Sequence, residues 1–359
     1  MSFWRALWPA LLLCAASTQA DDGYLGAAAC AACHAEQSTS QQLAGHARSL
    51  SRPLDHPLAD RLAGPAELQR DGRFSFSIQR ADDVLEVVAA GTDESTRLIV
   101  DWAFGAGDQA VTLVSRIDED WYIEHHWSYY ASADDYAVTP GHQGVVADDL
   151  GQALGVRYRT FSPRAEIFTC FRCHSTGPLS LGDQFQIQPS ELGVRCESCH
   201  GPGARHVAAV SSGDTEAARR AIENPGRLEP DALLARCGQC HRPPAEQPSE
   251  VDYRDPWNVR HQPLYMTRSR CFTDSVKLTC MTCHDPHQNV VRNDAASYRT
   301  LCLDCHTEPQ TQPAPTCGEP ARADCVSCHM PKVRPHEHLS FTNHWIGVFE
   351  GGEALVPRR

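Results

Sequence analysis

Seven pairs of cysteines in this chain of 359 residues share one spacing. Two residues separate the members of each pair, and a histidine follows the second cysteine directly. The pairs are Cys30 and Cys33, Cys170 and Cys173, Cys196 and Cys199, Cys237 and Cys240, Cys280 and Cys283, Cys302 and Cys305, and Cys325 and Cys328. The histidines that follow them are His34, His174, His200, His241, His284, His306 and His329. We number these motifs one to seven in chain order.

The spacing is that of covalent haem attachment. Two thiols three positions apart on a helical turn can each form a thioether with a vinyl group of haem, and the adjacent histidine then binds the iron as its proximal ligand. Zinc sites and redox-active dithiols also use paired cysteines, but neither requires histidine in the next position. Histidine is only 18 of 359 residues, so chance does not explain seven such placements. We therefore predict seven covalently bound haem c groups.

The second axial position of each iron separates an electron carrier from an enzyme, because a histidine there saturates the iron and a vacancy leaves it reactive. Eleven histidines lie outside the motifs, which exceeds the seven positions to be filled. The candidate distal ligands, chosen by their place relative to the motifs, are His46, His206, His261, His287, His338 and His344. For the other five a surface or hydrogen-bonded role is the stronger expectation. Only Met266 among the methionines stands away from a motif and the initiator position, so ligation by two histidines should dominate.

The N-terminus has the features of a secretory signal peptide. Arg5 precedes an apolar run over residues 6–16, and small residues at 18 and 20 predict cleavage after Ala20. The run is too short to span a bilayer. Cys14 raises the alternative of lipid attachment, but Leu13 stands where a small residue is required. The predicted location is periplasmic or otherwise exported.

Two cysteines outside the motifs, Cys271 and Cys317, flank the fifth and sixth motifs together. Export to an oxidising compartment would allow them to form a disulfide, and two buried free thiols are the alternative. The formal net charge of −13 argues against a nucleic-acid partner, because binding to phosphates requires concentrated Lys and Arg.

No motif occurs between His34 and Cys170, and the sequence there has a different texture. Phe74, Phe76 and Ile78 alternate with polar residues, and several further apolar runs are separated by Gly- and Asp-rich turns. This pattern predicts a small antiparallel sheet of about five strands. It could serve as a docking surface, as a lid over a haem, or as packing material.

From Cys170 onward, Pro and Gly interrupt the chain repeatedly and few amphipathic periods are long. Haem faces must supply much of the apolar core there, so this part should not fold without haem. The predicted fold is mostly α with extensive irregular loops, organised around seven haems, with a small antiparallel β insertion. The predicted divisions are a signal peptide (1–20), a first haem segment (21–65), a β-rich insertion (66–165) and a six-haem domain (166–359).

The residues around several motifs resemble the multihaem cytochromes grouped with cytochrome c554 and the doubled-CXXCH, tetratricopeptide-associated cytochromes. The matching pieces are Ala28–His34, Cys196–Gly203, Ser269–Phe272, Cys283–His287, Cys328–Lys332 and Phe341–His344. The resemblance implies periplasmic electron transfer and mostly bis-His ligation, with His206, His287 and His344 in ligand positions. Tetratricopeptide repeats accompany some relatives, but this sequence has no 34-residue repeat.

Two functions follow from these observations. The first is electron transfer through closely spaced haems to redox partner proteins. The acidic surface of this protein would favour partners that have basic patches. The alternative is an oxidoreductase that acts on a small nitrogen or sulfur compound at one five-coordinate haem. All seven motifs keep their histidine, so the Lys replacement typical of nitrite reductases is missing. His125 and His126, with Tyr129 and Tyr130, could line a haem pocket, although aromatic pairing between strands is the stronger expectation.

Overall fold

The computed structural model describes residues 23–64, 66–160, 166–243, 248–275, 277–306 and 324–358. The predicted signal peptide and Cys317 lie outside these ranges. About 36% of the described residues are helical and about 26% are in strands, in several antiparallel sheets. The expected fold, mostly α with a small β insertion, is therefore wrong. A haem motif needs only one helical turn, so seven motifs produce short helices, while the motif-free region folds as extensive sheet.

Two antiparallel sheets occupy most of the chain between the first and second motifs. The larger sheet contains β1 (Leu50–Ser51), β6 (Trp102–Phe104), β7 (Ala110–Asp118), β8 (Trp121–Tyr130), β9 (Asp135–Val138) and β10 (Gly155–Arg159). Its order is β1-β6-β7-β8-β10, with β9 also paired to β8. The smaller sheet contains β2 (Ala66–Arg70), β3 (Phe74–Ala81), β4 (Val84–Ala90) and β5 (Ser95–Ile99) in sequential order. The region expected to hold about five strands thus holds β2 to β10.

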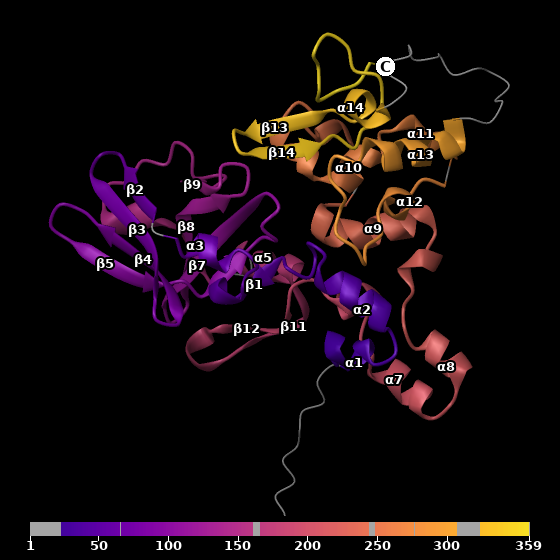
Figure 1. Ribbon diagram of the computed structural model, residues 1–359, viewed down its shortest axis with the longest axis horizontal. Coiled ribbons are helices and arrows are strands. Elements are labelled where there is room, and N and C mark those ends of the chain that lie inside the picture. The colour runs from indigo at the N-terminus through magenta and orange to yellow at the C-terminus, as the bar shows by residue number, and fades with distance from the viewer. Residues whose placement is uncertain are drawn as a thin grey trace, which may run out of the picture.

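The helices are short, and seven of them carry the motifs. The motif helices are α1 (Ala27–Ala31), α5 (Glu166–His174), α6 (Cys196–His200), α9 (Pro230–His241), α12 (Cys280–Cys283), α13 (Ala295–His306) and α14 (Cys325–His329). The others are α2 (Ala35–Gln42), α3 (Ala59–Leu62), α4 (Leu150–Leu154), α7 (Ala204–Ser211), α8 (Thr215–Arg220), α10 (Gln262–Met266) and α11 (Arg270–Ser275). In Figure 1 the sheets lie on the left, and the motif helices run from α1 near the bottom through α9 to α14 at the top.

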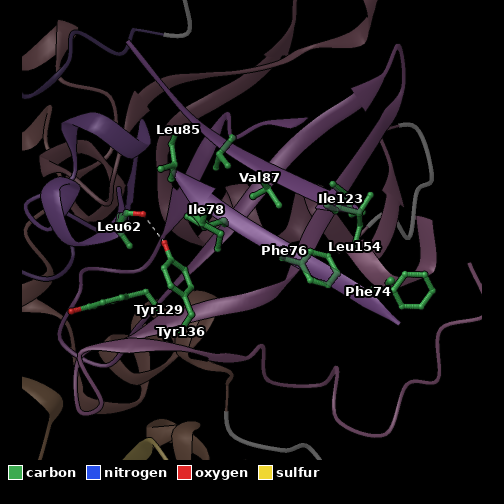
Figure 2. Close-up of a cluster of buried hydrophobic side chains, with 14 of the residues drawn as sticks. Leu62, Phe74, Phe76, Ile78, Leu85, Val87, Ile123, Tyr129, Tyr136 and Leu154 are labelled. Atoms are coloured by element: carbon green, nitrogen blue, oxygen red, sulfur yellow. Dashed lines mark hydrogen bonds between the residues drawn. The ribbon is translucent and has the colours of Figure 1, made fainter. Parts of the chain in front are cut away.

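The two large sheets share one hydrophobic core (Figure 2). In β3 the alternation of apolar and polar residues puts Phe74, Phe76 and Ile78 inside and the intervening serines partly outside. Ile123 of β8 packs into the same core from the larger sheet. The Tyr136 hydroxyl donates to the Leu62 carbonyl at 2.8 Å, which ties α3 to this core.

The larger sheet also packs against the second motif helix. Trp102 and Phe104 of β6 meet Phe171 of α5 edge to face, with ring centroids 5.3 and 5.1 Å apart. The hairpin of β11 (Ser175–Leu181) and β12 (Ile187–Leu192) follows α5, and the Ile187 amide donates to the Tyr122 hydroxyl at 2.8 Å. The sheet is therefore a support for α5.

A second hairpin connects the sheet to the last motif. It consists of β13 (Lys332–His336) and β14 (Leu339–Thr342). The side-chain amide of Gln109 donates to the Ser340 carbonyl at 2.6 Å, and the His336 ring stacks on Tyr130 with centroids 4.9 Å apart. Segments about 200 residues apart in sequence thus hold each other in place (Figure 1). Within the described ranges, no helix has the length and apolar character needed to cross a membrane.

The shared core predicts a clear difference between two substitutions in the smaller sheet. Phe76 is 2% exposed, so Phe76→Ala should lower the free energy of unfolding by about 3–5 kcal/mol through lost burial and a residual cavity. Ile99 is 53% exposed, so Ile99→Ala should change it by about 0.5 kcal/mol. Urea denaturation followed by far-UV circular dichroism measures both. Equal effects would contradict the assignment of the core.

Candidate haem-binding sites

Each motif lies on a helical turn that ends at or beside its histidine. The helices α6 and α14 consist of the motif alone, and the motif closes the longer α9 and α13. The first motif continues beyond α1, because the His34 amide donates to the Cys30 carbonyl at 2.9 Å. Residues three apart on such a turn are neighbours, so each pair of thiols faces one side.

Four motif histidines face a second histidine ring. The ring centroids are 6.3 Å apart for His34 and His206, 6.1 Å for His200 and His287, 5.9 Å for His241 and His46, and 6.4 Å for His284 and His344. Two imidazoles bound to opposite sides of one metal ion, through bonds of about 2 Å, have centroids roughly 6 Å apart. The spacing of these pairs therefore fits one iron between each pair of rings.

Five of these eight histidines, and the motif histidines His174 and His329 outside the pairs, have ring nitrogen Nδ1 at a hydrogen-bond acceptor. The distance from Nδ1 to the acceptor is 2.8 to 3.2 Å in every case. Five acceptors are backbone carbonyls: Ser49 for His174, Glu223 for His200, Ala218 for His206, Gly347 for His329 and Thr342 for His344. The other two are side-chain oxygens, of Asp285 for His287 and of Gln262 for His241. Such a bond fixes the tautomer and leaves Nε2 as the ligand atom. These imidazoles are thus oriented before any metal binds.

Burial keeps several of these imidazoles neutral. It lowers the pKa of His344 to about 4, and it also lowers the pKa of His46, His174, His241 and His284. A neutral imidazole has the free lone pair that a metal requires. The residues present therefore fit haem iron in charge state as well as in spacing.

The stretch from His284 to His287 contacts three of the four pairs. His284 belongs to the pair with His344, and the Asp285 carboxylate accepts from the His287 ring at 3.1 Å. The His46 ring bonds to the Pro286 backbone. These four residues thus position parts of the third, fourth and fifth motif sites. The sequence identifies His287 as a candidate ligand, but the contacts of Asp285 and Pro286 could not be predicted from the motif pattern.

Glu197, which lies between the cysteines of the third motif, joins that motif to the first. Its buried carboxylate accepts from the backbone amides of Gly26 and Gly203 at 2.8 and 2.7 Å, and from that of Leu25 at 3.0 Å. Leu25 and Gly26 lead directly into α1. Sequence reasoning missed this role, because an acidic residue inside a motif usually faces solvent.

Contacts between motif helices define an order. The Cys30 and Cys196 thiols contact each other, as do Cys173 with Cys240, Cys237 with Cys280, and Cys302 with Cys325. The helix pair α12 and α13 is also in contact. Motif three approaches motif four through Glu223, whose carbonyl accepts from His200 and whose carboxylate pairs with Arg236, next to Cys237; burial first and then Cys237 raise the pKa of the Cys199 thiol. The order is therefore one, three, four, five, six, seven, with motif two joined to motif four as a branch.

The remaining predicted ligands have other neighbours. His261 lies 3.3 Å from a guanidinium nitrogen of Arg242, and the His338 ring lies against Tyr130 with centroids 5.3 Å apart. Neither is in the four pairs. The ring next to His174 is Phe104, at 5.4 Å. The second ligands of motifs two, six and seven are thus not among the pairs.

His125 and His126 are part of the larger sheet. The register of β7 and β8 shifts between Thr112 and Val114, which makes room for both buried rings in β8. His125 Nε2 is 2.8 Å from the Ser115 hydroxyl. The ring contacts of His126 are with Trp127 and His142 rather than with a motif histidine.

Cys271 is a free thiol in the structure and lies close to the motif cysteines Cys283 and Cys305. Its predicted partner, Cys317, falls outside the described residues. The disulfide between them remains a prediction.

The buried His125 predicts a pH dependence of stability. Burial lowers its pKa to about 3, below the unfolded value of about 6.5. The unfolded chain therefore binds more protons between these values, so this contribution to stability is complete above about pH 6.5 and declines as the pH falls towards 3. His125→Gln, which does not titrate, should lose stability less steeply over that range in urea denaturation. Profiles that run parallel between about pH 3 and pH 6.5 would contradict the prediction. Between pH 7 and 8, where neither state binds this proton, the two profiles should run parallel.

Two family models match separate parts of the chain. The family model for cytochrome c554 and c-prime matches residues 155–201, and that for the doubled CXXCH motif matches residues 275–311. No curated protein matches the chain. The crystal structure of the outer cell wall cytochrome OcwA aligns with a TM-score of 0.51 and 15% sequence identity, over 90% of this chain and 79% of that one. At this identity the likeness concerns the fold. The resemblance expected from the motif contexts is confirmed, and the chain is a multihaem c-type cytochrome.

Proposed function

We propose that this protein is an exported electron-transfer protein with seven haem c groups, most of them held by two histidines. The observation that carries the proposal is the set of four imidazole pairs at axial spacing, each with one histidine from a motif. Bound haem supplies a site that accepts and releases one electron without further chemistry. A saturated iron suits transfer better than substrate turnover.

The residue roles follow from the motifs and the pairs. The fourteen motif cysteines would form the thioethers, and the seven motif histidines would be the proximal ligands. His206, His287, His46 and His344 would be the distal ligands at motifs one, three, four and five. The division into a first haem segment, a β-rich insertion and a six-haem domain, with cleavage after Ala20, belongs to the same proposal.

The order of motif contacts supports a continuous route for electrons. Motifs one and seven stand at its two ends, near the bottom and the top of Figure 1, and motif two forms a side branch that packs against β6 of the larger sheet. Redox partners would dock near these ends. Exposed acidic residues at the turns of the smaller sheet, including Asp71, Asp82, Asp83, Asp93 and Glu94, lie away from these ends and add to the negative charge of the protein, which favours partners with basic surfaces.

A pair of histidine variants tests the ligand assignment. His206→Ala should convert one of the low-spin haems to a species that binds carbon monoxide, because the iron of motif one loses its second imidazole. His338→Ala is the control and should leave all low-spin signals unchanged, since His338 is outside the pairs. Optical and EPR spectra of the holoproteins, with haem counted by mass, provide the readout. Loss of a low-spin signal in the control alone would overturn the assignment.

A second function, catalysis at one five-coordinate haem, is favoured by the surroundings of motif two. The neighbouring ring of His174 is Phe104, whereas four other motif histidines face an imidazole. If this iron is open, the unmodified protein should show a high-spin signal from about one haem in seven, and that signal should change when hydroxylamine or nitrite binds. A protein whose haems are all low-spin and take up no ligand is an electron carrier only.

A further inference from the structure

The hydrogen-bond acceptors behind the candidate axial histidines differ in charge. His174, His200, His206, His329 and His344 are held by backbone carbonyls, and His241 is held by the neutral side chain of Gln262. His287 is held by the carboxylate of Asp285 at 3.1 Å. Among these seven histidines of the described chain, it alone has a charged acceptor.

The Asp285 carboxylate is fixed in place by its own neighbours. One oxygen accepts from the His287 backbone amide at 2.9 Å as well as from the His287 ring, and the other accepts from the Gln288 side chain at 2.8 Å. Pro286 follows directly and limits the backbone conformations of the loop. The negative charge is therefore held at a defined point on the ring of His287.

A carboxylate behind a ligating imidazole makes that imidazole a stronger electron donor. The ferric iron, which carries one more positive charge than the ferrous iron, gains more from such a ligand. The reduction potential consequently falls, since second-shell hydrogen bonds are among the determinants of haem potentials. A neutral amide or carbonyl acceptor has a smaller effect.

We infer that Asp285 lowers the reduction potential of the haem at motif three below those of its neighbours at motifs one and four. The inference rests on the proposed function, because it takes His200 and His287 as the two ligands of that haem. Asp285 acts through His287 and is therefore a positioning residue for electron flow.

The position of motif three in the contact order gives this effect a consequence. Motif three stands between motif one and motif four. An electron that leaves the ferrous haem of motif one, oxidising it to ferric, must reduce motif three before motif four can accept it. A low potential there makes this step uphill, so Asp285 would separate an entry site at motif one from the pool formed by motifs four to seven.

Two opposite substitutions test the inference. Asp285→Asn removes the charge while keeping an oxygen acceptor, and it should shift the midpoint potential of the motif-three haem upward. Gln262→Glu places a carboxylate behind His241, where the structure has an amide oxygen at 3.2 Å, and it should shift the motif-four haem downward. EPR-monitored potentiometric titration of the seven-haem protein gives both shifts. The signals are assigned beforehand with His287→Ala and His46→Ala, each of which should remove one low-spin signal.

The outcomes separate the inference from the proposed function. If both ligand variants remove their signals but neither Asp285→Asn nor Gln262→Glu moves a potential, the tuning role is wrong and the ligand assignment stands. If His287→Ala leaves every low-spin signal intact, the pairing of His200 with His287 fails, and the proposed ligation fails with it. If Asp285→Asn does not yield folded protein, the shift in Gln262→Glu decides the inference, and an unchanged motif-four potential would reject it.

Discussion

The structure depends on the orientation of imidazole rings by hydrogen bonds at Nδ1. A motif of five residues can attach a haem, but it cannot choose the second ligand or its angle. Acceptors such as Ser49, Glu223 and Gln262 hold the motif histidines, and the second ligands have acceptors of their own, such as Ala218 for His206, Asp285 for His287 and Thr342 for His344. Each acceptor fixes one tautomer and so directs Nε2 towards the iron position.

The sheets provide the conventional hydrophobic core that the motif region lacks. Phe76 and Ile123 pack between the two sheets. Phe104 of the larger sheet contacts Phe171 of α5 and the ring of His174. Ser49 makes the same link through the backbone, because its carbonyl accepts from both the Gly105 amide and His174. The β-rich region is therefore a scaffold for motif two, and the C-terminal hairpin ties it to the last motif.

The chemistry was largely predictable from the sequence, whereas the architecture was not. The motifs are local, and His206 and His287 lie close to motifs, so proximity favoured them as ligands. His261 and His338 satisfied the same criteria yet face Arg242 and Tyr130, because long-range packing decides which ring meets which. The fold class was wrong because the pattern in β3 was recognised but the extent of the sheets was not. The roles of Glu197 and Asp285 depend on partners that no local pattern identifies.

The central claim is that seven irons lie in this chain and that four of them are held between specific imidazoles. Anomalous X-ray scattering at the iron edge from crystals of the holoprotein locates each iron directly. We predict seven peaks, with four lying midway between His34 and His206, His200 and His287, His241 and His46, and His284 and His344. Fewer than seven peaks, or peaks that lie away from these four midpoints, would contradict the claim.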